Sequence, residues 1–393
     1  MRVCLHTFWE VSHGFIGGTE RFLIELSKEL RSLGYDPFIA CTGPRSHREV
    51  DGVEVVASIP DRYLPALAKH GSANPDFLRE EFIDRFEWPE AIRLLSELVS
   101  EQLSQLEADV FHVNSFVSSS HLSLSKPIIV TNHENAQESD HLWGDGFFSF
   151  LVQAASVRNI LLHQHAALAV PSRHYAQKYA QQMGLPILAM KQGVRLDTFP
   201  VRMKPGGVIR GSPLKLLLPS RFEPHQKGHD IAVDALEILG KMAIHADITF
   251  SGIREDHLLA LRDFRDKIQK RGLAEQIRFT RYNAIQEAFQ ECDVVISPER
   301  YCSYGLSVSE SLALGIPTIL SDIPTYREIG LGYRHALFFK SGSAESLAQQ
   351  IYRAMGSLKP VERAEAIRFR SQNDLRECAK AYGALYGAAA EKG

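Results

Sequence analysis

Residues Ser297 to Glu328 read SPERYCSYGLSVSESLALGIPTILSDIPTYRE, and this stretch indicates which fold to expect for the rest of the chain. The apolar run Val294–Ile296 just before it is typical of a short buried strand in a parallel sheet. A loop containing Gly305 follows, then a helical pattern over Leu306–Leu314, then a second apolar strand, Pro317–Leu320. A strand, a glycine loop, a helix and a strand form a βαβ unit, so the stretch predicts an α/β fold.

The loop Ser303, Tyr304, Gly305 and Leu306 lies where parallel sheets bind ligands, outside the carboxyl ends of the strands. Its backbone N–H groups open a helix, and the helix dipole favours an anion at that end. Glu310 follows one turn into the helix, where its carboxylate can accept hydrogen bonds from sugar hydroxyls. The pattern therefore predicts a site for a nucleotide diphosphate, and an ordinary βαβ unit without a ligand is the alternative.

The stretch also resembles the signature of retaining glycosyltransferases with the GT-B fold, in glycosyltransferase family 4. That signature has Pro, a spacer, Glu, Gly-aromatic-Gly-Leu, a second Glu after three residues, and a small-residue helix that ends in Gly-x-Pro. The chain keeps most of these positions, namely Pro298, Tyr304, Gly305, Leu306, Glu310, Gly315 and Pro317. It departs at two of them, because Cys302 replaces the first Glu and Ser303 the first Gly.

Length and composition indicate a two-domain globular protein. A chain of 393 residues is long enough for two domains, and a hydrophobic content of 45% allows a core in each. The formal net charge of -3 argues against nucleic acid as the main partner. The five cysteines are scattered without a C-x-x-C pair, which predicts neither a disulfide framework nor a zinc site. The strand-like start MRVCLHTF has no signal-peptide pattern, so we expect a cytoplasmic protein.

The chain also lacks the run of roughly 18 apolar residues that a membrane span needs. The best candidate, Gly146–Leu162, contains Gln153, Arg158 and Asn159 and is interpreted as a soluble helix. The alternative is an interfacial role for Phe147–Phe150. It would bring the N-terminal domain into peripheral contact with a membrane, at the inner face of the plasma membrane.

Strands and helices alternate through both halves of the chain. In the first half we expect strands at Arg2–Thr7, Tyr35–Cys41, Val53–Val56, Asp109–Val113, Pro127–Thr131, Ala167–Val170 and Ile187–Met190. Expected there too are a helix over Arg21–Leu33, a loop over Pro60–Asn74, and helices over Asp76–Glu107 with a break at Trp88-Pro89. In the second half we expect strands at Leu214–Leu218, Asp247–Ser251 and Ile277–Thr280, with helices over His229–Gly240, Asp256–Arg271, Ala284–Glu291, Ser343–Met355 and Glu362–Ala389.

The Gly- and Pro-rich segment Lys204–Pro213 is interpreted as a linker. We expect an N-terminal domain over residues 1–204 and a C-terminal domain over residues 205–370. The family resemblance implies that both are Rossmann-like, doubly wound domains facing each other across a cleft. It also implies that a C-terminal helix, here residues 371–393, returns to the N-terminal domain.

Arg221 and Lys227 lie on one loop after the strand Leu214–Leu218. The planar fork of Arg and the compact charge of Lys suit a diphosphate, although a solvated basic loop is the alternative. The loop resembles the Arg, spacer and Lys-Gly that bind the donor's phosphates in family 4. No D-x-D pair occurs in the chain, so we expect these fixed cations to replace a metal, and we expect no cofactor.

Several further residues take roles only through the family resemblance. Gly17 and Gly18 lie in a Gly-Gly-x-Glu loop that faces the donor phosphate, and Glu20 of that loop lies on the acceptor side. His133 follows a strand where the family has a His that contacts the donor sugar, although a lone His is more often structural. The remaining assignments are His112 and Asn114 on the acceptor side, and Gly252, Arg281 and Tyr282 near the donor nucleotide.

The resemblance implies transfer of a sugar from an NDP-sugar to an acceptor hydroxyl with retention at the anomeric carbon. Arg221, Lys227 and the N–H groups of Tyr304–Leu306 would stabilise the leaving diphosphate, Glu310 would hold the ribose, and His133 would orient the sugar. The acceptor would be a saccharide or a lipid-linked saccharide, since surface-polysaccharide assembly is the commonest setting of the family. The alternatives are a catalytically silent nucleotide-sugar-binding protein, which the Cys302 substitution suggests, and a GT-B sugar-nucleotide epimerase.

Overall fold

The computed structural model describes most of the chain. The described residues are 1–8, 10–11, 18–70, 77, 79–83, 85–115, 119, 121–133, 167–195, 212–253, 258–281, 285–357 and 363–391. They form two compact units, the first made of Met1–Gly193 and Leu375–Gly393 and the second of Val194–Asp374. Gly17, Tyr282, the segment 146–162 and residues 204–211 of the expected linker lie outside the described residues.

The first unit is built on an eight-stranded sheet with the order β3-β4-β2-β1-β5-β6-β7-β8. Its strands are β1 (Arg2–Thr7), β2 (Asp36–Thr42), β3 (Ser46–Val50), β4 (Val53–Ser58), β5 (Val110–Val113), β6 (Ile128–Thr131), β7 (Ala167–Val170) and β8 (Leu188–Ala189). Only the β3–β4 pair among them is antiparallel. The order runs outward in both directions from the neighbours β1 and β5, which places a topological switch point between them.

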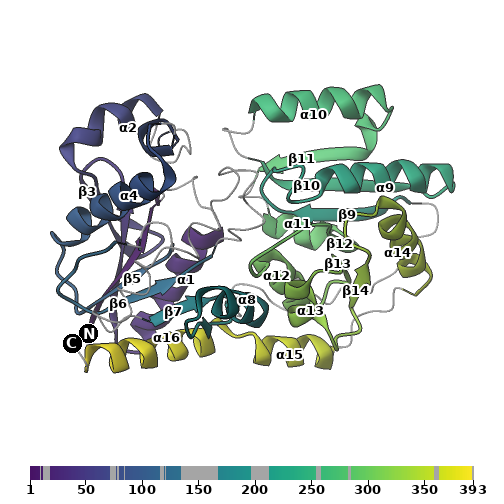
Figure 1. Ribbon diagram of the computed structural model, residues 1–393. Helices are drawn as coiled ribbons and strands as arrows, with labels where there is room; N and C mark the ends of the chain where they lie inside the picture. Colours follow the sequence, from purple (N-terminus) through teal and green to yellow (C-terminus); the bar gives the residue numbers. More distant parts are fainter. Residues whose placement is uncertain are drawn as a thin grey trace. The chain divides into compact units, whose positions relative to one another are not determined.

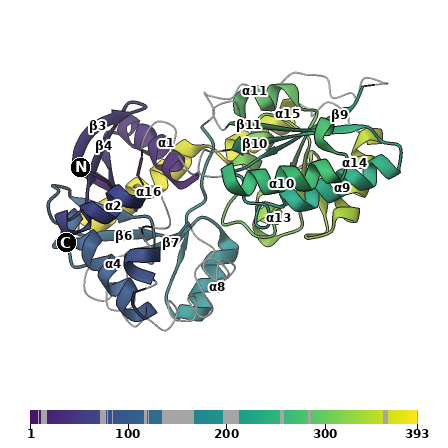
Figure 2. The same ribbon diagram turned by 90° about the horizontal axis from the view of Figure 1, so that it is seen from above.

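Helices cover both faces of this sheet (Figures 1 and 2). The described helices are α1 (Gly18–Ser32), α2 (Leu64–His70), α4 (Trp88–Leu103), α8 (Arg173–Met183) and the C-terminal α16 (Leu375–Ala390), with short turns at Asp61–Tyr63 and Arg79–Ile83. One hydrophobic core joins the sheet to α2, α4 and α8. Helix α16 lies against α1 and β5, so the last helix belongs to the first unit. No described helix is both long enough and apolar enough to cross a membrane.

The second unit contains a six-stranded sheet with the order β11-β10-β9-β12-β13-β14, and its described strands are all parallel. The strands are β9 (Leu214–Pro219), β10 (Ala246–Ile253), β11 (Ile277–Arg281), β12 (Val294–Ser297), β13 (Thr318–Ser321) and β14 (Ala336–Phe339). The chain moves outward from β9 to β11 and then outward from β12 to β14 on the other side. The switch point of this sheet therefore lies between β9 and β12.

Two cores hold the helices of the second unit on opposite faces of the sheet (Figure 1). The helices are α9 (His229–Lys241), α10 (Leu258–Lys270), α11 (Ile285–Glu291), α12 (Leu306–Ala313), α13 (Pro324–Gly330), α14 (Ala344–Ser357) and α15 (Arg363–Gln372). One core contains residues of α9, α10 and α14, and the other contains residues of α11, α12, α13 and α15. This layering agrees with the expected doubly wound α/β class.

Among the described residues, several local elements differ from the sequence-based expectation. Strand β3 was missed because its sequence, SHREV, is mostly polar and lies at the edge of the sheet. Its turn, Asp51-Gly52, with φ of 51° and 80°, is nevertheless a typical hairpin signal. The expected loop Pro60–Asn74 contains α2, whose Pro65 sits in the first turn, where proline is tolerated. Helix α13 and strand β14 were also not expected.

Candidate functional site

Two loops meet at the switch point of the second unit. The first, Ser220–Gly228, follows β9, and the second, Pro298–Gly305, follows β12. Gly228 has a φ of 70°, and a Cβ atom added there would lie 2.1 Å from the carbonyl oxygen of Pro298. Only glycine allows this approach, because such a contact would push the backbones apart. The Lys-Gly pair of the sequence therefore places Lys227 against the second loop.

Ion pairs and hydrogen bonds also hold the two loops together. Lys227 donates from Nζ to Glu299 Oε2 at 3.0 Å. Arg300 binds both carboxylate oxygens of Asp230 at 2.9 and 2.7 Å, and its backbone N–H donates to the carbonyl of Gln226 at 3.0 Å. The Gln226 side chain in turn accepts from Arg221 Nη2 at 3.0 Å, while Arg221 itself is exposed. The structure thus brings the two predicted phosphate cations onto one loop and gives both a defined position.

Cys302 is buried in the second loop, with 7% of its surface exposed. Burial and the nearby Glu299 carboxylate raise the pKa of its thiol to about 12, so the thiol is neutral at pH 7. Below the loop, the fully buried Tyr326 hydrogen-bonds Ser297 through its hydroxyl at 2.8 Å. The Tyr326 ring also lies so close to Gly305 that a Cβ there would be 2.6 Å from it. The Tyr326 ring therefore packs directly against this loop and supports it.

Helix α12 begins directly after Gly305, whose φ of 99° marks the left-handed N-cap. The N-cap Gly305 has no side chain that could bond the first N–H groups of the helix, and the backbone N–H of Tyr304 lies within hydrogen-bonding reach of the Cys302 thiol. Anion binding by the N–H groups of Ser303 to Leu306 stays a prediction. Glu310 is on the second turn of α12 and only 4% exposed, and Tyr304 is 3% exposed. Gly252 and Arg281 lie at the carboxyl ends of β10 and β11 in the same sheet. The structure thus collects the described donor-side residues of the second unit at one edge of its sheet. The other two described donor-side residues lie in the first unit, where Gly18 begins α1 and His133 follows β6.

The switch point of the first unit holds a second group of predicted residues. Glu20 is buried on α1 and accepts a hydrogen bond from Thr7 Oγ1 at 3.0 Å. His133 Nε2 lies 2.8 Å from Asn114 Oδ1, and Gln192 Nε2 lies 2.8 Å from His133 Nδ1. An acceptor on one side and a donor on the other fit the neutral, Nε2-protonated ring. Burial lowers the pKa of His133 to about 3, in agreement with that form.

His112 is fully buried, and both its ring nitrogens are engaged. Nδ1 lies 2.7 Å from the hydroxyl of Tyr386 on α16, and Nε2 lies 2.7 Å from Thr131 Oγ1 on β6. Thr131 is also 3.1 Å from the hydroxyl of Tyr382. These contacts give His112 a structural role, because they fasten the C-terminal helix to the sheet. An acceptor contact by His112 stays a prediction.

These buried histidines should make the stability of the first unit depend on pH. Burial lowers the pKa of His6 to about 4 and that of His112 and His133 to about 3, from an ordinary value of 6.5. The unfolded chain then binds more protons below pH 6.5. We expect the free energy of unfolding to fall between pH 7 and pH 5, by up to about 1.4 kcal/mol per pH unit for each histidine. Urea unfolding at several pH values measures the slope.

In a His112→Asn variant, the free energy of unfolding should change less steeply with pH than in the wild type. The control is His47→Asn, which replaces an exposed ring on β3 and should keep the slope of the wild type. A free energy of unfolding that stays constant from pH 7 to pH 5 would contradict the assignment of neutral buried rings.

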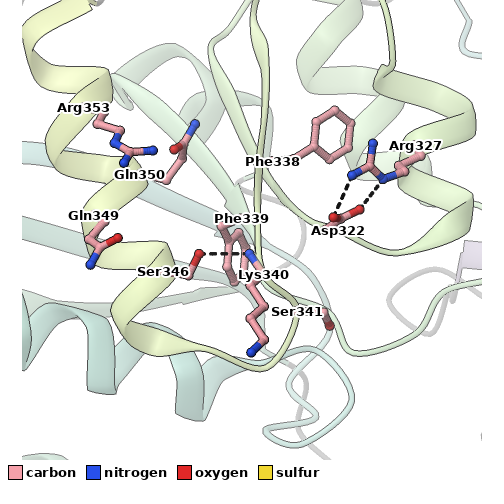
Figure 3. A pocket seen from close by; sticks show the side chains of 10 residues that line it. All are labelled: Asp322, Arg327, Phe338, Phe339, Lys340, Ser341, Ser346, Gln349, Gln350 and Arg353. Carbon is pink, nitrogen blue, oxygen red and sulfur yellow. Dashed lines mark hydrogen bonds and ion pairs between the residues drawn. The ribbon is translucent and has the colours of Figure 1, made fainter.

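The second unit also has a cavity of about 440 Å³ near the edge strand β14 (Figure 3). Its lining comes from the end of β13, from α13, from β14 and from α14, and includes the Asp322–Arg327 ion pair. None of the predicted donor-site residues lines it. Among the described residues there is also no group of three or more His, Cys, Asp and Glu side chains arranged to hold a metal ion.

Sequence reasoning missed three residues that shape these sites. Gln226 orients Arg221, Gln192 orients His133, and Tyr326 supports the loop after β12. Gln226 directly precedes the Lys227-Gly228 pair, and this position in the sequence could have indicated a role for Gln226 in the site. Nothing local marks Gln192 or Tyr326, because each is brought to its partner by the fold.

Similar solved structures support the predicted fold. Sucrose-phosphate synthase (tll1590) from Thermosynechococcus elongatus aligns over 100% of both chains with a TM-score of 0.75 and 14% identity. Anabaena Alr3699/HepE in complex with UDP-glucose aligns over 99% of this chain and 100% of that one, with a TM-score of 0.67 and 15% identity. At such identities the matches show the fold alone, and they confirm the predicted GT-B class.

Sequence relatives match only part of the chain. The lipopolysaccharide core biosynthesis mannosyltransferase LpsB of Rhizobium meliloti (strain 1021) is 27% identical over 110 residues, which is 28% of this chain and 31% of LpsB. The chain thus matches less than a third of that relative's length. Two family models cover far more, with Glycosyltransferase Family 4 matching residues 16–197 and Glycosyl transferases group 1 matching residues 203–368. Since the two models together span most of both units, the chain belongs to glycosyltransferase family 4, with a group 1 glycosyl transferase region as its second unit.

Proposed function

We propose that the protein transfers a sugar from a nucleotide-diphosphate sugar to an acceptor hydroxyl, with retention at the anomeric carbon. The observation that carries the proposal is the site at the β9/β12 switch point. There the cations Arg221 and Lys227 share one sheet edge with the N-terminus of α12 and the carboxylate of Glu310. A diphosphate needs the cations and N–H groups, and a ribose suits the carboxylate.

The proposed reaction breaks the bond between the anomeric carbon and the diphosphate and forms a bond to the acceptor oxygen. Arg221, Lys227 and the N–H groups at α12 stabilise the charge that grows on the leaving diphosphate. The acceptor proton passes to a phosphate oxygen on the same face, so no side-chain general base is assigned. Glu310 holds the ribose hydroxyls. Neutral His133 orients the donor sugar, which is the role that the family resemblance assigns to it.

The proposed setting is the assembly of a surface polysaccharide in the cytoplasm. LpsB, named for lipopolysaccharide core biosynthesis, supports a saccharide or lipid-linked saccharide as the acceptor. The structure of HepE with UDP-glucose supports a nucleotide-sugar as the donor. A lipid-linked acceptor would be met at the inner face of the plasma membrane. The Phe147–Phe150 segment proposed for such contact lies outside the described residues.

A thermal-shift screen with UDP-, GDP-, dTDP- and ADP-sugars tests the donor proposal. A ligand at a hundred times its Kd should stabilise the protein by about 2.7 kcal/mol. The Lys227→Ala variant should lose most of that shift with the same ligand. If no nucleotide-sugar or nucleotide stabilises the wild type, the proposed function is wrong.

A catalytically silent binding protein is the second candidate, because Cys302 occupies the place of a Glu in the family signature. It predicts that the donor found in the screen binds normally while no acceptor yields product. An epimerase predicts a changed sugar on the nucleotide without any acceptor. Product analysis by mass spectrometry and NMR, with and without acceptor, distinguishes the three functions.

We further propose that no divalent metal takes part, since Arg221 and Lys227 supply fixed positive charge to the diphosphate. Activity in excess EDTA should therefore stay within about twofold of the untreated enzyme. The measurement is product formation before and after chelation, with and without added Mg²⁺ or Mn²⁺. Complete loss that either ion restores would contradict the assignment.

A further inference from the structure

The ion pair between Lys227 and Glu299 is the most buried ion pair among the described residues of the candidate donor site. Nζ and Oε2 are 3.0 Å apart, and the side chains are only 16% and 3% exposed. The two residues are 72 positions apart in sequence, on the two loops that Gly228 brings together. A salt bridge this deep interacts strongly, because little water screens it.

The other groups near Glu299 that the structure describes do not neutralise its negative charge, so Lys227 is its counter-ion. The Cys302 thiol beside it is held neutral by burial and by the Glu299 charge, which raise its pKa to about 12. Burial likewise raises the pKa of the nearby Tyr326 hydroxyl well above its usual value, so this group is neutral as well. Arg300, the next cation along the loop, directs its guanidinium to Asp230 instead. Within the described contacts, Glu299 therefore bonds one cation, and that cation is Lys227.

We propose that Glu299 is an internal counter-ion that occupies Lys227 in the empty site and competes with the donor's diphosphate for the same ammonium group. It is a positioning residue that sets nucleotide affinity, and it touches Lys227 rather than the reacting atoms. The inference rests on the proposed function, since it takes Lys227 as a diphosphate ligand. The Glu299 carboxylate and the diphosphate interact with the same positive charge on Lys227, so each weakens the attraction of the other to it.

Two effects of removing the Glu299 charge oppose each other. A freed lysine gains rotamer freedom, which binding must then remove, and this weakens binding. However, removing one partner of a buried pair leaves an uncompensated charge, and that cost falls on the empty protein. In the variant, a bound diphosphate supplies the missing negative charge next to Lys227. It is also no longer repelled by the carboxylate of Glu299. Because the pair is mostly buried, we expect the charge effect to be the larger one.

Isothermal titration with UDP and GDP as probes tests the inference. The Glu299→Gln variant should bind the preferred nucleotide about tenfold more tightly than the wild type, which corresponds to about 1.4 kcal/mol. Lys227→Met should weaken binding, and the double variant should bind like Lys227→Met alone. The loss of the gain in the double variant would show that Glu299 acts through Lys227.

Asp322→Asn is the matched control, because it also removes an ion-paired carboxylate of the second unit, but one that pairs with Arg327 beside the cavity near β14. It should change the Kd by less than about twofold. Unchanged or weaker binding by Glu299→Gln would overturn the inference, and so would a gain that persists in the Lys227→Met background. A wild type that binds neither UDP, GDP nor any other nucleotide would instead contradict the proposed function.

Discussion

Replacing Arg221 or Lys227 by alanine should lower kcat/KM by about a hundredfold each, which corresponds to about 3 kcal/mol of transition-state stabilisation. The proposed function assigns both side chains to the diphosphate, whose negative charge would grow as the bond to the sugar breaks. Arg221 is oriented by Gln226, and the close approach at Gly228 places Lys227 against the second loop, so both cations lie at the sheet edge of the candidate site. The measurement is steady-state transfer with the donor identified by the nucleotide-sugar screen.

The two variants should differ in stability. Arg221 is exposed, so its loss should leave the unfolding temperature unchanged. Loss of Lys227 leaves the Glu299 carboxylate buried without its counter-ion, so Lys227→Ala should unfold at a lower temperature. The double variant Lys227→Ala, Glu299→Gln should recover stability but not activity, which separates the two effects.

Arg327→Ala is the matched control for these substitutions. Arg327 is also an ion-paired cation of the second unit, but it binds Asp322 beside the cavity near β14 (Figure 3). Its replacement should leave kcat/KM within about twofold of the wild type. Near-normal turnover by Arg221→Ala or Lys227→Ala would show that the assignment of that residue is wrong.

The second large effect is expected at Glu310, and it contrasts with a small one at Cys302. Glu310→Ala should lower kcat/KM by about a hundredfold, because the buried carboxylate that we propose to hold the ribose hydroxyls is lost. Cys302→Ser should cost less than about threefold, since a neutral hydroxyl replaces a thiol of similar size that the neighbouring Glu299 also keeps neutral. Parallel kinetic and thermal measurements on both variants give the contrast.

Cys302→Glu, which restores the residue of the family signature, should not improve transfer from the natural donor. Position 302 is buried beside Glu299, so a second carboxylate there would face the first one in a poorly solvated place. We expect a lower unfolding temperature and no gain in kcat/KM. A gain of tenfold or more with that donor would show instead that the chain carries a degraded family site.

Local sequence was enough to predict most strands and helices, the α/β class and the loops that carry the site. Continuous apolar runs such as Val294–Ile296 predicted buried parallel strands, because both faces of such a strand are covered by helices. Gly305 was expected in a loop at the carboxyl edge of the sheet, and the structure shows close contacts at Gly305 and at Gly228 that require glycine. These features follow from the properties of single residues and their neighbours, so they can be read without the fold.

The partners of those residues were decided only by the tertiary structure. Glu299 meets Lys227, Tyr326 supports Gly305, and His112 bonds Tyr386 on α16, and each pair joins segments far apart in the chain. Such contacts depend on the order of the strands, since that order selects which loops share a sheet edge and which helix covers which face. The sequence by itself thus determined the chemical groups of the site, and the strand order decided which of them are paired.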